Sequence, residues 1–128
     1  MKKILAIAFI CLAAVTAACG QNKSGKSMNG DFAYPVKLIS DKTTNGVREI
    51  VVKTNAQVCS KQIDVKIKNG VIQKVEFTGG CPGNTQGVER LVAGMKVQDA
   101  VDRLGGIDCA GRGTSCPDQL VQALLIAL

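Results

Sequence analysis

Four cysteines are the residues of this chain with the greatest chemical potential, and they are Cys59, Cys81, Cys109 and Cys116. They are separated by 21, 27 and 6 residues, so these four form no C-x-x-C pair of the kind found in zinc knuckles. Thiolates are the soft ligands that zinc and iron–sulfur clusters prefer. We therefore expect the four side chains to meet at one thiolate site that binds zinc or an iron–sulfur cluster.

Two other interpretations of these cysteines stay open. Small exported domains often carry disulfides, and four cysteines allow three connectivities, of which Cys109 with Cys116 closes the shortest loop. A redox-active dithiol is the third interpretation. Cys81 and Cys116 are predicted at helix N-termini, where the helix dipole favours a negative thiolate, so either could be the attacking sulfur.

The composition excludes several other functions. The chain has no histidine, which excludes Ser-His and Cys-His nucleophile pairs and histidine metal ligands. Aromatic residues make up 3%, too few to stack nucleic-acid bases, and the net charge of +6 comes partly from lysines spaced along predicted strands, as on a solvated sheet face. The Gly-rich loop 109–115 could cradle a phosphate, but it lacks Walker spacing, so nucleotide binding is the less favoured interpretation.

The first 31 residues have the pattern of an export signal followed by a tether. Two lysines, an apolar run from Ile4 and small residues before Cys19 predict a lipoprotein-type signal peptide over 1–19, with Cys19 lipidated. A plain signal peptide or a signal anchor is the alternative. Residues 20–31, rich in Gly, Ser, Asn and Lys, predict a flexible tether. We expect an exported lipoprotein, anchored to a membrane of the cell envelope through its lipid, or a cytoplasmic protein if the leader does not function.

Strands are predicted in the first half of the remaining domain, 32–128. Residues 32–40 predict a weak edge strand because Pro35 removes a ladder donor. Residues 47–54 are rich in β-branched side chains and predict a second strand. Apolar and polar residues alternate on both sides of Asn69-Gly70, a type I′ turn signal, and predict a hairpin over 63–77.

Helices are predicted in the second half, over 85–93, over 97–104 and from Cys116 onward, where Pro117 suits the first turn. Strands followed by helices indicate an α+β fold, a small antiparallel sheet followed by three helices. We expect three acids, Asp99, Asp102 and Asp118, to be helix-surface or capping residues. Apolar residues fall at helical spacing in the first helix (Val88, Leu91 and Val92) and on one face of the second (Val97, Ala100, Val101 and Leu104). In the third helix the expected buried stripe is Leu120, Ala123, Leu124 and Ala127.

Residues 56–128 resemble the stand-alone TSCPD-domain proteins. The resemblance is carried by Val58-Cys59-Ser60, by VEFTGGCPGN at 75–84, by LVAGM at 91–95 and by GTSCPDQL at 113–120. A related domain lies near the C-terminus of cobalamin-dependent ribonucleotide reductases, so the resemblance implies ribonucleoside-diphosphate reductase and deoxyribonucleotide synthesis. This chain is too short for the barrel of that enzyme. The resemblance therefore implies an accessory domain or thiol donor to a reductase-like partner and leaves open whether the chain is itself an enzyme.

The order of elements is also similar to that of iron–sulfur scaffold proteins of the NifU and IscU type. Carried over by position, that similarity implies that Cys59, Cys81 and Cys116 are three ligands of a cluster or of zinc. The chain departs from the scaffolds at Ser60-Lys61, where they have an aspartate, and at Ser115, where many have a histidine. Cys109 would then supply the fourth ligand.

Overall fold

The computed structural model describes residues 32–128. The predicted signal peptide over 1–19, the lipidation of Cys19 and the tether over 20–31 lie outside the described residues. Within 32–128, no helix is both long and apolar enough to cross a membrane.

One antiparallel sheet holds four strands in the order β1-β2-β3-β4. They are β1 (Lys37–Thr44), β2 (Val47–Lys53), β3 (Ser60–Lys68) and β4 (Val71–Gly79). The turns at Asn45-Gly46 and Asn69-Gly70 have positive φ at both central residues, as type I′ hairpins require. The hairpin over 63–77 is therefore confirmed. The weak first strand was misplaced, since β1 begins only after Pro35 and continues to the turn, where pairing with β2 holds it extended.

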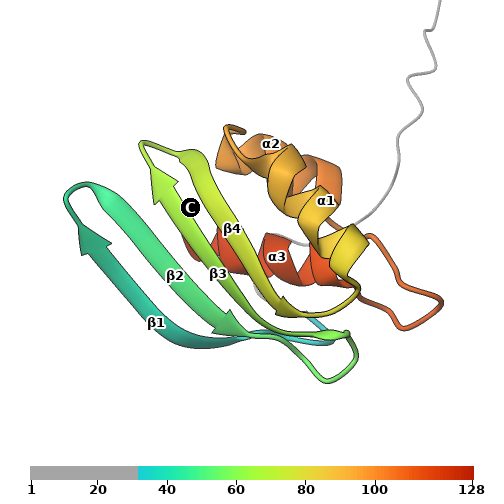
Figure 1. Cartoon of the computed structure of the whole chain (residues 1–128). Helices are drawn as coiled ribbons and strands as arrows, with labels where there is room; N and C mark the ends of the chain where they lie inside the picture. Colours follow the sequence, from blue (N-terminus) through green and yellow to red (C-terminus); the bar gives the residue numbers. More distant parts are fainter. Residues whose placement is uncertain (1–31) are drawn as a thin grey trace, which may run out of the picture.

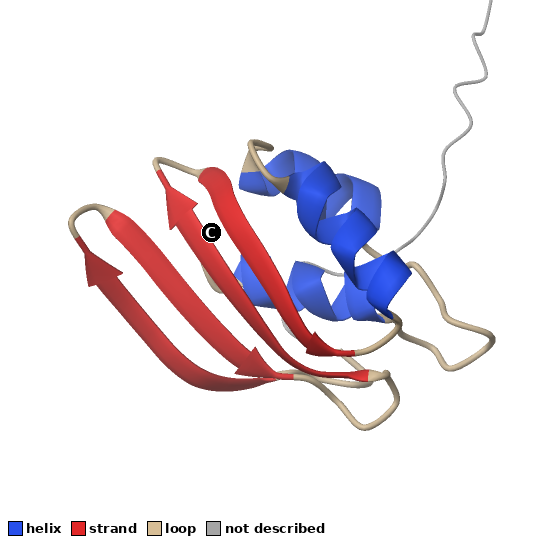
Figure 2. Cartoon of the chain, viewed as in Figure 1, coloured by secondary structure: helices blue, strands red, loops and turns tan. Residues whose placement is uncertain are grey.

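Three helices follow the sheet: α1 (Pro82–Val92), α2 (Val97–Leu104) and α3 (Cys116–Leu125). Figures 1 and 2 show α3 lying across one face of the sheet, with α1 and α2 on the side of β4. Helix α3 contacts β2 and β3, α2 packs on α3, and α1 contacts β4. The arrangement confirms the predicted α+β fold.

The core lies between the sheet and α3. Its buried apolar side chains come from β2, β3, β4 and all three helices: Ile50, Val52, Ile63, Val65, Ile67, Ile72, Val75, Val92, Val97, Ala100, Val101, Leu120, Val121, Ala123 and Leu124. Leu91, one of the three apolar residues at helical spacing in α1, does not join the core, because it is 72% exposed. Helix α1 flanks β4 and buries a narrow side that includes Thr85 and Val92, so its neighbour Leu91 faces outward.

The outer edge of β4 is covered by the chain that follows it. The Phe77 amide donates to a carboxylate oxygen of Glu89 on α1 at 2.7 Å. The segment between α1 and α2 then bonds to β4, with Ile72 donating to the Met95 carbonyl and Gly94 to the Ile72 carbonyl, both at 2.8 Å. These bonds satisfy edge groups that would otherwise be unpaired and fix the direction in which the chain leaves β4.

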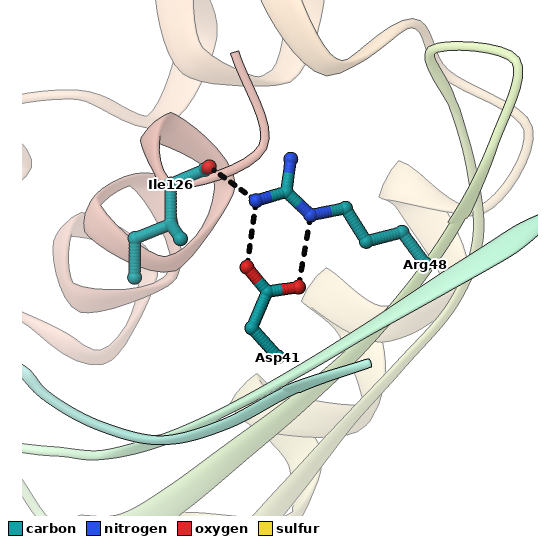
Figure 3. A network of polar contacts seen from close by, with 3 residues as sticks. All are labelled: Asp41, Arg48 and Ile126. Atoms are coloured by element: carbon teal, nitrogen blue, oxygen red, sulfur yellow. Dashed lines mark hydrogen bonds and ion pairs between the residues drawn. The ribbon is translucent and has the colours of Figure 1, made fainter. Parts of the chain in front are cut away.

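Arg48 forms a bidentate ion pair with Asp41 inside the β1–β2 hairpin and a hydrogen bond to the end of α3 (Figure 3). The Arg48 guanidinium donates to both carboxylate oxygens of Asp41, at 2.9 and 2.7 Å, and to the Ile126 carbonyl at 3.0 Å. The hydrogen bond from Arg48 lowers the pKa of Asp41, and the charge of the guanidinium acts in the same direction. One side chain thus holds the C-terminal helix against the first hairpin.

Asp41→Asn should remove a stabilising contribution that depends on pH. Because the folded pKa of Asp41 lies below the ordinary value of 3.8, this contribution is present above that pH and is lost as pH falls through the folded pKa. Melting curves should show wild type above D41N at pH 7, with the gap closing below pH ~4. Arg48→Met should lose this pH-dependent part and, at every pH, the bond to the Ile126 carbonyl as well. A gap between wild type and D41N of constant size at every pH would contradict the assignment.

Candidate functional site: a pocket lined by four thiols

Four cysteines that are far apart in the sequence line one pocket of about 290 Å³. Its other lining residues are Val58, Asn84, Ile107, Asp108, Arg112, Ser115 and Pro117. Cys59, Cys81 and Cys109 are exposed and Cys116 is half-buried, and all four are free thiols. The structure therefore brings every predicted thiolate residue of the domain to the same cavity.

Strand pairing brings Cys59 and Cys81 to the same end of the sheet. Cys59 directly precedes β3, Cys81 directly follows Gly80 after β4, and the last pair of this ladder joins Ser60 to Gly79. Gly80 has φ +94°, and a Cβ there would lie 3.0 Å from the Thr85 methyl group. A residue with a side chain would be strained at this turn, so glycine is what allows β4 to pass directly into α1.

Cys81 and Cys116 lie where two helices begin, as the sequence predicts. Cys81 is the N-cap of α1, and its carbonyl accepts from the Thr85 amide at 3.0 Å. Cys116 is the first residue of α3, after the N-cap Ser115. Both cysteines thus lie at helix N-termini that border the same pocket.

Cys109 lies in a closed loop between α2 and α3. The Asp108 carboxylate accepts from the amides of Gly111 and Gly113, both at 2.6 Å. The Cys109 amide donates to the Thr114 carbonyl at 3.1 Å. Gly113 has φ +75°, and a Cβ there would lie 2.8 Å from the Tyr34 ring, so the loop lies against the segment before β1. The position of Cys109 is therefore set by backbone bonds and one carboxylate.

Two polar side chains contact sulfur atoms in the pocket. An Arg112 Nη1 group donates to the Cys59 sulfur at 3.6 Å, and the Ser60 hydroxyl donates to the Cys116 sulfur at 3.2 Å. The pKa of Arg112 is raised, first by its hydrogen bond to Cys59 and then by the charges of Cys59, Cys109 and Cys81. Arg112 is the one basic residue among those lining the pocket, and it acts as a counter-charge to the thiols.

The donor set suits a soft metal, but the side chains do not form a ligand shell as they stand. Sulfur ligands in this number are typical of zinc and iron–sulfur sites. Among residues 32–128, no three Cys, Asp or Glu side chains are arranged so that they could hold an ion. The expected ligands Cys59, Cys81, Cys109 and Cys116 therefore share a pocket without converging on a point.

Residues next to Cys116 position it through a buried polar network. Asp118 accepts from the Gly106 amide at 2.9 Å and from the Thr114 hydroxyl at 2.8 Å, and the Ser115 hydroxyl caps α3 by accepting from the Asp118 amide. Gln119 accepts from the Asn55 amide at 2.9 Å and donates to the Tyr34 carbonyl at 2.7 Å. The TSCPDQ run therefore holds three loops around the start of α3.

Asp118 is the acid in the first turn of α3 but is buried and not on the helix surface, whereas Asp99 and Asp102 are exposed on α2. Asp118 is 1% exposed because its partners come from the α2–α3 loop. The burial of Gln119 was also not predicted from the sequence. The available signal was its position directly before Leu120, an apolar residue that is itself buried. An amide at such a position must find partners for both its oxygen and its nitrogen.

Gln119→Leu should destabilise the domain by about 2 kcal/mol, because a similar volume is kept while partners of the amide lose their hydrogen bonds. Urea unfolding measures this loss. Gln98→Ala is the control. Gln98 lies on α2 and makes an exposed side-chain hydrogen bond to Asp102 of α2, so we expect this variant to change the free energy of unfolding by under about 0.5 kcal/mol. Equal losses in the two variants would show that the buried amide has no special role.

Comparison with known proteins gives one match. The model of the TSCPD domain family matches residues 34–128. No curated protein and no solved structure matches the chain at a significant level. The family match begins earlier than the resemblance seen in the sequence, and it includes Tyr34, whose carbonyl accepts from Gln119. The chain belongs to the TSCPD domain family.

Proposed function

We propose that this domain binds a thiophilic metal, zinc or an iron–sulfur cluster, in the pocket lined by Cys59, Cys81, Cys109 and Cys116. One observation carries the proposal: four cysteines from four separate segments line a single pocket. Cys59 directly precedes a strand, Cys81 and Cys116 lie at helix starts, and Cys109 lies in a loop. Structural disulfides alone do not require all four thiols to meet at one cavity.

Local structure supports this proposal. Cys59 and Cys81 are brought to one end of the β3–β4 ladder, and Cys109 is held by the closed loop around Asp108. Val58, Ile107 and Pro117 supply apolar walls that would limit water around the metal. Binding still requires the thiol side chains to turn inward, because they do not form a ligand shell as they stand.

Metal ligation would also stabilise a small domain with few aromatic residues. Ligation of structural zinc contributes on the order of 10 kcal/mol, which is comparable with the whole stability of a domain of this size. The elements that would be tied together are β3, α1, the α2–α3 loop and α3. A bound metal would therefore stabilise the end of the domain at which its strands pass into its helices.

Anaerobically purified protein should contain metal in stoichiometric amount, measured by elemental analysis together with a thiol count. Cys81→Ser should lose that metal and melt less cooperatively, because a thiolate is replaced by a poor ligand. Leu91→Ser, exposed on the same helix and outside the pocket, should keep the metal. Metal-free protein with four accessible thiols, or with two disulfides, would overturn the proposal.

A thiol accessory domain for ribonucleoside-diphosphate reductase is the second candidate. Cys109 and Cys116 are both free and line the same pocket, so they could form the working pair of a dithiol. The test is the reduction potential of the disulfide formed between them. A potential below about −300 mV would identify a structural bridge, whereas a potential near that of thioredoxin would support electron transfer to a partner.

The proposed location is the surface of a membrane in the cell envelope, with the domain held through a lipid on Cys19. The sequence pattern of residues 1–31 supports this proposal. The mass of the full chain from the membrane fraction is the direct test. A chain that starts at Cys19 with an added diacylglycerol group is expected, and a soluble chain that retains Met1 would contradict it.

A further inference from the structure

The thiol pocket has two hydrogen-bond donors aimed at sulfur that the proposed ligand set does not include. We propose that Arg112 and Ser60 are positioning residues of this pocket, which stabilise thiolate-bound metal by donating to the Cys59 and Cys116 sulfurs. The inference rests on the proposed function and extends it to the residues that set metal affinity. Partners of this kind typically change metal affinity by about 10–100-fold when they are removed.

Arg112 is placed for this role by the closed loop. Its Nη1 group lies 3.6 Å from the Cys59 sulfur. Its backbone amide donates to the Cys109 carbonyl at 3.3 Å, and the amides on either side of it, from Gly111 and Gly113, donate to Asp108. Arg112 is therefore held between two cysteines of the pocket by its backbone and by its side chain.

Ser60, which follows Cys59 in the chain and does not itself line the pocket, is the second donor. It is 2% exposed, and its hydroxyl lies 3.2 Å from the Cys116 sulfur. Its carbonyl accepts from the Thr54 hydroxyl at 2.6 Å, and β3 pairs it with Gly79. Because the backbone of Ser60 is held on two sides, its hydroxyl is pre-organised toward sulfur.

Charge gives Arg112 a second effect. Four thiolates around a divalent ion leave two negative charges on the complex, and a cation beside the sulfurs offsets one of them. Asp108, the one acid of the lining, directs its carboxylate to the amides of Gly111 and Gly113. The Arg112 guanidinium thus contacts a cysteine sulfur, whereas the Asp108 carboxylate is bound by backbone amides of the loop. This arrangement of charges favours a metal complex with excess negative charge.

Cobalt(II) is the probe, because thiolate-to-cobalt charge-transfer absorption reports the number of sulfur ligands and follows the affinity in competition with a chelator. Arg112→Gln should weaken cobalt binding at least tenfold, Arg112→Lys should recover part of the loss, and Ser60→Ala should weaken binding about tenfold. Arg103→Gln, an exposed arginine of α2 outside the pocket, is the control. The absorption per bound ion should stay unchanged, since the sulfur ligands remain.

The outcomes separate this inference from the proposed function. If Cys81→Ser abolishes cobalt binding while R112Q and S60A bind as tightly as R103Q, the positioning roles are wrong and the metal site stands. If wild type shows no cobalt–thiolate absorption, the proposed function fails and this inference fails with it. Melting of the metal-free variants distinguishes a weakened site from an unfolded domain, and R112K, which keeps the charge, gives a further check if R112Q does not fold.

Discussion

The buried amide of Gln119 is the interaction on which the rest of the structure most depends. Fully buried polar groups must find partners, and this side chain bonds to Asn55, Tyr34 and Thr114, from three different segments. Its neighbour Asp118 accepts from Gly106, at the other end of the α2–α3 loop from Thr114. Apolar packing has no preferred direction, whereas hydrogen bonds do. These hydrogen bonds therefore set where α3 begins relative to the sheet.

The start of α3 in turn determines the geometry of the thiol pocket. Cys116 opens this helix, and Ser60, which contacts its sulfur, belongs to β3. The β3–β4 ladder then places Cys59 beside the turn that carries Cys81. The positions of these three thiols therefore depend on backbone pairing and on buried polar side chains.

Sequence reasoning predicted the local features and missed the long-range ones. The hairpin at Asn69-Gly70 and the start of α3, where Pro117 suits the first turn, depend on the backbone preferences of a few adjacent residues. The extent of β1 depends instead on pairing with β2, and the burial of Asp118 depends on a loop 12 residues earlier. The contact of Arg112 with Cys59 joins residues 53 positions apart, which composition and spacing do not encode.

The TSCPD run combines two kinds of residue in one short segment. Ser115, Asp118 and the adjacent Gln119 form the frame, whereas Cys116 faces the pocket. The hydrogen bonds of this frame are made by carboxylate, amide and hydroxyl groups and involve no sulfur. This division explains how a pocket with exposed thiols can stay in place in a small fold: the residues that hold its walls are among the most buried polar residues described. The residues that could react or bind metal are thus different from the buried polar residues that hold the pocket in place. A metal that binds to the thiols would bind to a pocket whose supporting hydrogen bonds are already formed.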